Sequence, residues 1–296
     1  MEQPRTPIII LGAGLSGLRT ALTLTRAGKD VLILEARDRI GGRVDTRTLG
    51  NLTVEMGAEW IGTKDVLMRE LCAEFGIELI NHELETRLLY EGTYFPPGEW
   101  SPGTGWEKEL ERLVKEFPSL TPNNVARLQN IDWWHFMAQH HVSVRDMNIL
   151  DLIRSTDFGE DMRFVPTYDV LYDYAVGGDG DEACTYTIKG GNHRLVDAML
   201  REIGLDRLVL SEVATQVIQD EHGVTVRCAS GREYSGQALV SAIPTLAVST
   251  IDWLPALPTP QQDAYAQVGY CRILKSAGSF NEVFWKSEKF EVVTDA

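Results

Sequence analysis

Three glycines near the start of the chain have the spacing of a phosphate-binding turn. Gly12, Gly14 and Gly17 form a G-x-G-x-x-G pattern directly after the apolar run at residues 7–11, and Glu35 ends a second apolar run eighteen residues further on. In such a turn the first glycine allows a tight bend, the second lets backbone N–H groups approach a pyrophosphate, and the third lets a helix pack on a strand. The acid accepts ribose hydroxyls. The context predicts a dinucleotide site.

The residues around these glycines predict an α/β fold. The stretch after Gly17 has the pattern of a helix that stops at Gly28, and it lies between two buried strands at residues 7–11 and 31–35. Glu35 also limits the choice of dinucleotide. Because a carboxylate repels a 2′-phosphate, the sequence disfavours NADP.

A second glycine pair follows Glu35 within the stretch "LEARDRIGGRVDT". Gly41 and Gly42 precede Arg43 directly, and a guanidinium matches two phosphate oxygens better than a lysine ammonium does. Arg43 is therefore a candidate ligand for a second anionic group. The alternative is a Gly-Gly turn beside a surface arginine.

The pattern E-A-x-x-R-x-G-G-R in this stretch resembles the N-terminal flavin fingerprint of the amine oxidase family, which includes monoamine, polyamine and L-amino-acid oxidases. The resemblance implies that FAD is the cofactor. It also implies that the glycine pair lets the loop close over FAD and that the arginine contacts its phosphate and flavin side. The cofactor-binding residues implied here, beside the three glycines, are Glu35, Ala36, Arg37, Gly41, Gly42 and Arg43.

Two later segments extend the resemblance. In "VEMGAEWIG" the family chain passes the flavin ring, which makes Gly57, Ala58, Glu59 and Trp60 candidate cofactor residues. Trp60 is equally well explained as core packing. Further on, the residue equivalent to Val213 meets the adenine through its backbone in the family, although a plain β-meander explains residues 210–244 as well.

The resemblance assigns a catalytic role to one lysine. Family members end a strand with a lysine and reach a Phe-Trp pair nine residues later, and Lys275, Phe284 and Trp285 have this register. In the family the lysine holds a water against flavin N5. The alternative is that Lys275 is one more exposed strand lysine.

The order of patterns predicts an α/β architecture in which a Rossmann-like FAD/NAD(P)-binding domain is interleaved with an α+β substrate domain. We expect a helix at residues 65–75, a hairpin at 86–96 and mainly helices at 105–175. The C-terminal remainder of the family fold is expected to be absent. The expected division is cofactor domain at 1–80 and 188–250, and substrate domain at 81–187 (mostly helical) and 251–296.

Composition excludes several classes of protein. The 296 residues carry a net charge of −15, which argues against nucleic acid as a partner. No stretch reaches the ~18 apolar residues of a membrane span, and the histidines of "DWWHFMAQHH" lack metal-ligand spacing, so we expect neither a membrane nor a metal. The cysteines are scattered, which fits a cytoplasmic location; they are Cys72, Cys184, Cys228 and Cys271.

The resemblance implies FAD-dependent oxidation of an amine or amino acid. Hydride would pass to flavin N5, the imine would hydrolyse to a carbonyl compound and ammonia or an amine, and O2 would be reduced to H2O2. The expected partners are this small-molecule substrate and O2, together with either a companion chain that completes the fold or further copies of the chain in a homo-oligomer. Two alternatives stay open: a related flavoprotein oxidase or desaturase of an apolar substrate, and a non-catalytic partial flavin-binding subunit.

Overall fold

A computed structural model describes residues 7–177, 185–285 and 290–295. The chain forms two compact units and passes between them several times. The first unit comprises Met1–Glu59, Leu67–Ile80 and Thr187–Gly269, and the second comprises Trp60–Val66, Asn81–Tyr186 and Tyr270–Ala296. Residues 251–269, which the sequence places with the substrate domain, therefore group with the first unit.

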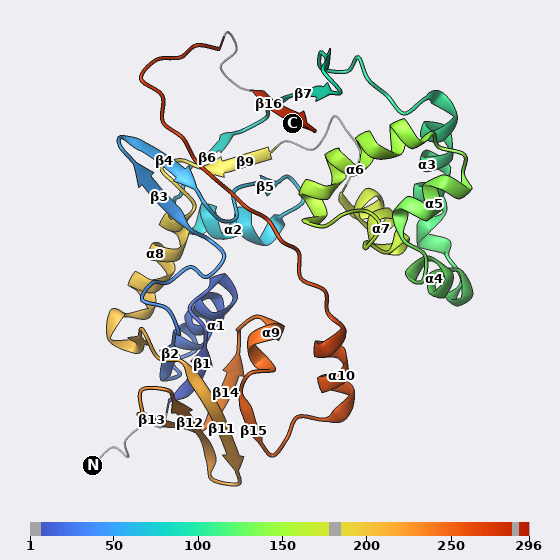
Figure 1. Cartoon of the computed structure of the whole chain (residues 1–296). Helices are drawn as coiled ribbons and strands as arrows, with labels where there is room; N and C mark the ends of the chain where they lie inside the picture. The colour runs from blue at the N-terminus through green and yellow to red at the C-terminus, as the bar shows by residue number, and fades with distance from the viewer. Residues whose placement is uncertain (1–6, 178–184, 286–289, 296) are drawn as a thin grey trace. The chain divides into compact units, whose positions relative to one another are not determined.

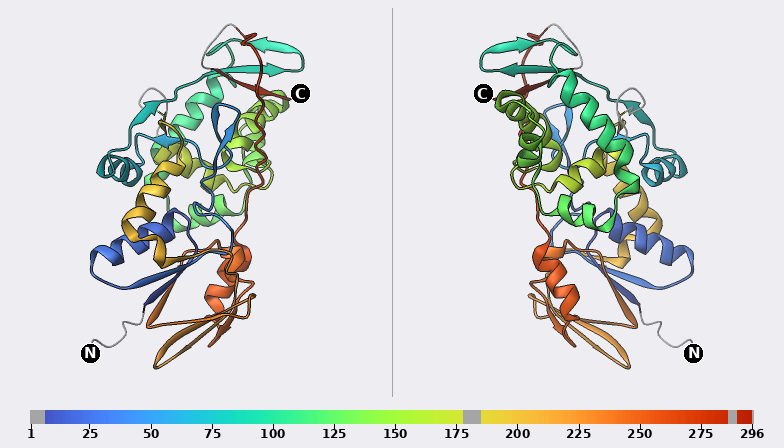
Figure 2. Two further views of the ribbon diagram at one scale, coloured as in Figure 1. Left: turned by 90° about the vertical axis from the view of Figure 1, so that its left-hand side faces the viewer. Right: turned by 90° about the vertical axis from the view of Figure 1, so that its right-hand side faces the viewer.

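A four-stranded parallel sheet forms the centre of the first unit (Figure 1). The inner strand β1 (Ile8–Leu11) is fully apolar. Ile9 and Ile10 have no exposed surface, as expected for a strand covered on both faces. Helix α1 (Leu15–Arg26) connects β1 to β2, and α8 (His193–Ile203) packs beside α1 (Figure 1, Figure 2). The strand order is β10 (Leu208–Val209), β2 (Val31–Leu34), β1 (Ile8–Leu11) and β14 (Ala238–Ser241).

A second sheet of the first unit contains the predicted β-meander. Strands β11 to β13 are antiparallel neighbours, and the short β15 runs parallel to β11, which explains why residues after 250 stay with this unit. Ile9, Val217 and Val226 share one apolar core between the two sheets. The strands are β11 (Ala214–Asp220), β12 (Gly223–Cys228), β13 (Glu233–Gly236) and β15 (Asp252–Leu254).

Shorter elements complete the first unit. Strands β3 (Thr46–Leu49) and β4 (Leu52–Glu55) form a hairpin, and α9 (Thr245–Val248) and α10 (Thr259–Gln267) follow the two sheets. The helix expected at 65–75 is present as α2 (Val66–Glu74), with Gly76 at φ +62° just beyond its end.

Five helices form most of the second unit, as the sequence predicts for residues 105–175. Side chains cap three of them: Thr121 accepts from the N–H of Asn124, Asp132 from His135 and Ser143 from Asp146. The aromatic residues of "DWWHFMAQHH" belong to the core of this helical region, where Trp133 and Phe136 stack with ring centroids 5.6 Å apart. The helices are α3 (Thr104–Glu116), α4 (Pro122–Gln129), α5 (Trp133–Gln139), α6 (Val144–Phe158) and α7 (Thr167–Gly177).

The strands of the second unit include the predicted hairpin. Strands β7 (Glu85–Tyr90) and β8 (Thr93–Phe95) join through Glu91 and Gly92, which both have positive φ, as a two-residue hairpin turn requires. Strand β16 (Phe290–Thr294) adds to β7 in parallel. Strand β5 (Ile61–Gly62) pairs with β9 (Thr185–Ile188), and β6 (Leu79–Asn81) lies where the chain passes from the first unit into the second.

One local prediction is wrong. The strand expected to end at Lys275 is not present, since residues 268–285 contain neither helix nor strand. A strand forms only when a neighbouring strand supplies its hydrogen bonds, and no described strand pairs with this segment. In the described part of the chain, no helix is both long and apolar enough to cross a membrane.

Candidate functional site

The turn between β1 and α1 requires two of its three glycines for packing alone. Gly12 has φ +97°, a conformation that side chains disfavour, and its N–H donates to the Leu34 carbonyl at 2.8 Å. A Cβ on Gly17 would lie 1.9 Å from the Gly12 carbonyl oxygen. Helix α1 can therefore approach this turn only with glycine at position 17.

Gly14 is different, because no neighbouring protein atom demands a glycine there. Its φ of −76° and ψ of 178° are open to any residue, and a Cβ would come no closer than 3.9 Å to another atom, the Gly42 Cα. Gly14 is also the N-cap of α1, whose first turn has no acidic residue and no capping side chain. An open helix N-terminus of this kind attracts an anion.

The second glycine pair lies against this helix start. Gly41 forms a parallel bridge with Gly14, and its N–H donates to the Ala13 carbonyl at 2.8 Å. Gly41 and Gly42 have φ of +96° and +60°, and a Cβ on Gly42 would lie 3.2 Å from the Gly14 Cα. The predicted loop thus meets the predicted turn through glycine backbone, and together they form the structure that we call the cradle: residues 12–17 and 41–43.

The arginines of the loop divide into two kinds. Arg37 donates to the Gly42 carbonyl at 3.3 Å, and Arg39 donates to the same carbonyl at 3.0 Å and to those of Ile40 and Val44. Arg43 is exposed, and its guanidinium makes no hydrogen bond or ion pair with any residue that the structure describes. Arg37 and Arg39 therefore hold the turn, and Arg43 is the cation available to a ligand.

Glu35 is buried at the base of the cradle, with 7% of its surface exposed. One carboxylate oxygen accepts from the N–H of Ala13 at 2.7 Å, and the other accepts from the N–H of Arg37 at 2.9 Å. Each oxygen keeps a second lone pair for a ribose hydroxyl. Ala36, which lies between Glu35 and Arg37 in the sequence, is exposed.

The segment after β4 supports Arg43. A Cβ on Gly57 would lie 2.0 Å from the Arg43 carbonyl oxygen, and Ala58 N–H donates to that oxygen at 2.9 Å. Asn192 Nδ2 in turn donates to the carbonyls of Ala58 and Glu59, at 3.0 and 2.8 Å. Gly57 is thus required by its contact with Arg43.

A half-buried polar network behind the cradle was missed from the sequence. Glu55 accepts from the N–H of Asn192 at 2.7 Å, and Thr46 Oγ1 donates to Glu55 at 2.8 Å and accepts from the N–H of His193 at 2.9 Å. The network joins the β3–β4 hairpin to the start of α8. Its one sequence signal is the hairpin register, which pairs Thr46 with Glu55.

Val213 lies beside the same edge of the parallel sheet. Glu212 N–H donates to the Glu35 carbonyl at 2.9 Å, which continues the backbone pairing past β2. Val213 is 46% exposed. Its carbonyl accepts from Ala229 N–H at 2.8 Å, whereas its own N–H bonds to no described atom.

The side chain of Glu212 anchors this loop from within. Its surface is 1% exposed, Ser230 Oγ donates to Oε2 at 2.8 Å, and Arg232 Nη2 lies 2.5 Å from Oε1 in an ion pair without hydrogen-bond geometry. Burial, reinforced by Glu212, raises the pKa of Cys228 to about 12.

Trp60 and Lys275 are brought together in the second unit. Trp60 is 54% exposed, so it is not core packing. The Lys275 ammonium lies 5.4 Å from the Trp60 ring centroid, within cation–π range. Lys275 is half-buried, although every other residue of 266–284 is exposed. Phe284 and Trp285 pack edge to face, with centroids 4.9 Å apart.

A parallel sheet, a glycine turn at an open helix N-terminus and a buried acid at the end of the next strand define a dinucleotide-binding fold of the flavoprotein kind. The chain belongs to the family described as flavin-containing amine oxidoreductases, which it matches over residues 15–295. The family and the fold class predicted from the sequence are confirmed, and the predicted cofactor agrees with the flavin in the family's description.

The chain is similar in sequence and in fold to several proteins that are named as amine oxidases. The chain is 23% identical to a probable flavin-containing monoamine oxidase A of Dictyostelium discoideum, over 97% of this chain and 68% of the relative. It is 27% identical to a putrescine oxidase of Kocuria rosea, over 95% and 66%. Among solved structures, cyclohexylamine oxidase from Brevibacterium oxydans IH-35A superposes with a TM-score of 0.78 at 26% identity, covering 89% of this chain and 63% of that one. The chain thus spans about two thirds of the length of these relatives.

Proposed function

We propose that the first unit binds FAD in the cradle. The observation that carries this proposal is Gly14, which neither its backbone conformation nor its protein neighbours require to be glycine. A ligand that approaches the backbone at the start of α1 supplies the missing reason. The free guanidinium of Arg43 and the uncapped helix N-terminus both favour an anionic group in that position.

The residues of the cradle and those around it then have distinct roles toward the cofactor. Arg43 and the first N–H groups of α1 bind the pyrophosphate, and Glu35 accepts the ribose hydroxyls while it holds Ala13. The free N–H of Val213 bonds the adenine. Gly41, Gly42, Arg37 and Arg39 shape the loop, and the segment Gly57–Glu59 fixes the backbone of Arg43.

We propose that the protein oxidises a primary or secondary amine or an amino acid. Bound FAD would supply a two-electron acceptor for the hydride of the amine α-carbon, which would convert the amine to an imine. Water would hydrolyse the imine to a carbonyl compound and ammonia or an amine, and O2 would take up the two electrons to give H2O2. Relatives named as monoamine, putrescine and cyclohexylamine oxidases support this reaction class. Lys275 orients a water at the reacting centre, and the face of Trp60 steadies its ammonium.

A cytoplasmic location is part of the proposal. Cys72, Cys228 and Cys271 are free thiols, two of them buried, as is common in a reducing compartment. Cys184 lies outside the described residues.

A flavin titration tests the cofactor proposal directly. The purified chain is titrated with FAD, and bound flavin is measured by its absorbance and by quenching of its fluorescence. We expect saturation at one FAD per chain. Failure to bind FAD by a folded chain, shown by its circular dichroism, contradicts the cofactor assignment.

A peroxide-coupled screen over monoamines, polyamines and L-amino acids then tests the reaction. Anaerobic addition of a substrate should bleach the bound flavin, because the amine transfers two electrons to it. If the chain binds FAD but none of these compounds bleaches the flavin, the proposed cofactor stands and the proposed amine oxidation is contradicted.

A further inference from the structure

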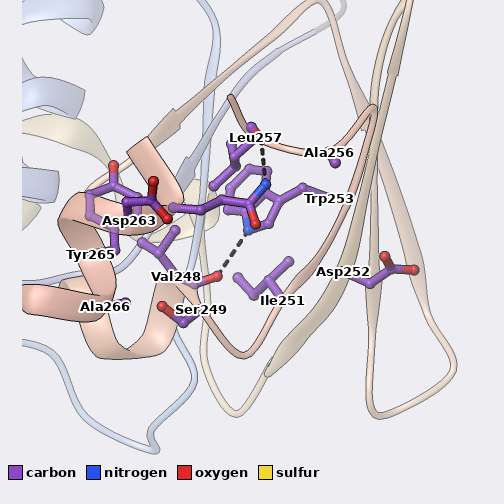
Figure 3. A pocket seen from close by; sticks show the side chains of 11 residues that line it. Val248, Ser249, Ile251, Asp252, Trp253, Ala256, Leu257, Asp263, Tyr265 and Ala266 are labelled. Carbon is purple, nitrogen blue, oxygen red and sulfur yellow. Dashed lines mark hydrogen bonds between the residues drawn. The ribbon is translucent and has the colours of Figure 1, made fainter. Parts of the chain in front are cut away.

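A pocket of about 450 Å3 lies in the first unit between α9, β15 and α10 (Figure 3). None of the residues that line it belongs to the cradle. Its volume falls within the range of ~300–1,000 Å3 in which proteins bind small molecules. The six lining residues that determine its chemistry are Val248, Ile251, Trp253, Gln262, Asp263 and Tyr265.

The apolar part of the pocket is rigidly built. Val248 and Ile251 are 5% and 7% exposed, so they are anchored in the body of the unit. Trp253 Nε1 donates to the Val248 carbonyl at 2.9 Å (Figure 3). This bond satisfies the indole's only polar atom and fixes the ring, which leaves a broad aromatic surface for a ligand.

The polar groups of the pocket are mainly acceptors, beside the hydroxyls of Ser249, which donates to the Thr245 carbonyl, and Tyr265, which accepts from Gln261 Nε2 at 2.7 Å. Gln262 Nε2 already donates to the Leu257 carbonyl at 2.5 Å, and no described residue donates to the Gln262 side-chain oxygen. The Asp263 carboxylate makes no hydrogen bond or ion pair with any described residue. The second carboxylate, Asp252, is held by Gln216 at 2.5 Å. No lysine, arginine or histidine is among the lining residues.

We infer that this pocket binds an organic ammonium ion with an aromatic or branched apolar body. The ammonium donates to Asp263 and to the oxygen of Gln262, and the body packs on Trp253 and Ile251. Open acceptors, a negative charge and an aromatic surface favour a cation, and the net charge of −15 raises its local concentration. An anion meets no cationic side chain among the lining residues, and the Asp263 carboxylate repels it. The inference rests on this pocket alone and is independent of the proposed FAD binding and amine oxidation.

The indole signal of Trp253 reports on the site. The full chain, without added FAD, is labelled with 15N-tryptophan and titrated at pH 7 with 2-phenylethylammonium, and in parallel with 2-phenylethanol, which has the same body but no charge. The Trp253 indole N–H resonance is assigned by its loss in Trp253→Phe. We expect a saturable shift of this resonance, with the ammonium bound roughly tenfold more tightly than the alcohol, because only the ammonium makes a charge-assisted hydrogen bond.

Two variants separate the charge from the cavity. Asp263→Asn should weaken the ammonium roughly tenfold and leave the alcohol unchanged, whereas Ala266→Leu should weaken both because it fills the pocket without changing the charge. Glu221→Gln, at a side chain 86% exposed on another loop, makes the same charge change and should have no effect. Equal binding of the two compounds, an ammonium affinity unaltered by Asp263→Asn, or a Trp253 resonance that does not move would overturn the inference.

Discussion

Adding one methyl group at Gly14 or at Gly17 should have opposite consequences, although the two glycines lie in the same turn. At Gly17 the methyl carbon would lie 1.9 Å from the Gly12 carbonyl oxygen, whereas unstrained C···O contacts are about 3.3–3.6 Å. The obstacle is backbone and cannot rotate away. At Gly14 the nearest atom is 3.9 Å away, and the backbone conformation suits alanine.

These distances set the expected stabilities of the two variants without cofactor. Gly17→Ala requires a backbone shift of more than ~1 Å, so the loss should reach or exceed the upper end of the ~1–3 kcal/mol typical of overpacking. Gly14→Ala gains ~0.4–1 kcal/mol from the less flexible unfolded chain and loses a similar amount because alanine is a poorer N-cap than glycine. Its melting temperature should therefore stay within about 3 °C of the wild type.

The affinity for FAD should fall in Gly14→Ala, although the stability of this variant is almost unchanged. In the proposed site, the Gly14 methyl group would occupy the space through which the pyrophosphate reaches the N–H groups of α1. Loss of one or two charge-assisted hydrogen bonds of ~1.5–3 kcal/mol each weakens FAD binding by about 100-fold or more. Fluorescence titration measures this affinity, and circular dichroism melting of the cofactor-free chain measures stability.

Two results would refute the reasoning. Wild-type FAD affinity in a folded Gly14→Ala variant would show that no ligand group approaches this backbone. A large fall in the melting temperature of cofactor-free Gly14→Ala would show that the protein itself requires the glycine. Gly28→Ala adds the same methyl group at the far end of α1, where no atom lies within 4 Å. Its φ of +71° makes alanine unfavourable there, so this variant should lose some stability and keep the FAD affinity of the wild type.

Three further outcomes are expected. Arg43→Ala should weaken FAD binding about 10- to 100-fold in a titration without lowering the melting temperature, whereas Arg39→Ala should lower the melting temperature because three carbonyls lose their donor. Lys275→Met should preserve the flavin spectrum and slow one half-reaction in stopped-flow traces, and wild-type rates would contradict its role. Iodoacetamide at pH 8 should alkylate exposed Cys271 and spare Cys228, whose pKa of about 12 leaves only about 10⁻⁴ of it as thiolate; peptide mass spectrometry distinguishes the two sites.

The parts of the site that the sequence predicts are those with local causes. Gly12 and Gly17 contact each other within one turn, and the hairpin at Glu91 and Gly92 depends on two adjacent residues. Signals of this kind are complete within a short window of sequence.

The parts that could not be predicted depend on distant segments. Position 57 must be glycine because a side chain there would collide with the Arg43 carbonyl. Asn192 donates hydrogen bonds to the carbonyls of Ala58 and Glu59, which lie more than 130 positions earlier in the sequence. The pairing of β16 with β7 joins segments about 200 residues apart. The strand expected before Lys275 is implied by the family resemblance, and no local pattern states whether a partner strand is present.

The two backbone bonds that Glu35 accepts limit how this protein could be re-engineered. Replacing the acid at this position is the usual first step in making a dinucleotide site accept a 2′-phosphate. Here Glu35→Ala or Glu35→Ser would also leave the N–H groups of Ala13 and Arg37 without their acceptor. The Ala13 N–H is buried, and a buried unsatisfied donor costs ~1–3 kcal/mol. Cofactor preference and the integrity of the turn are therefore coupled through one side chain. A substitution that broadens cofactor use would need a second change nearby to restore an acceptor, so this specificity should drift slowly under mutation.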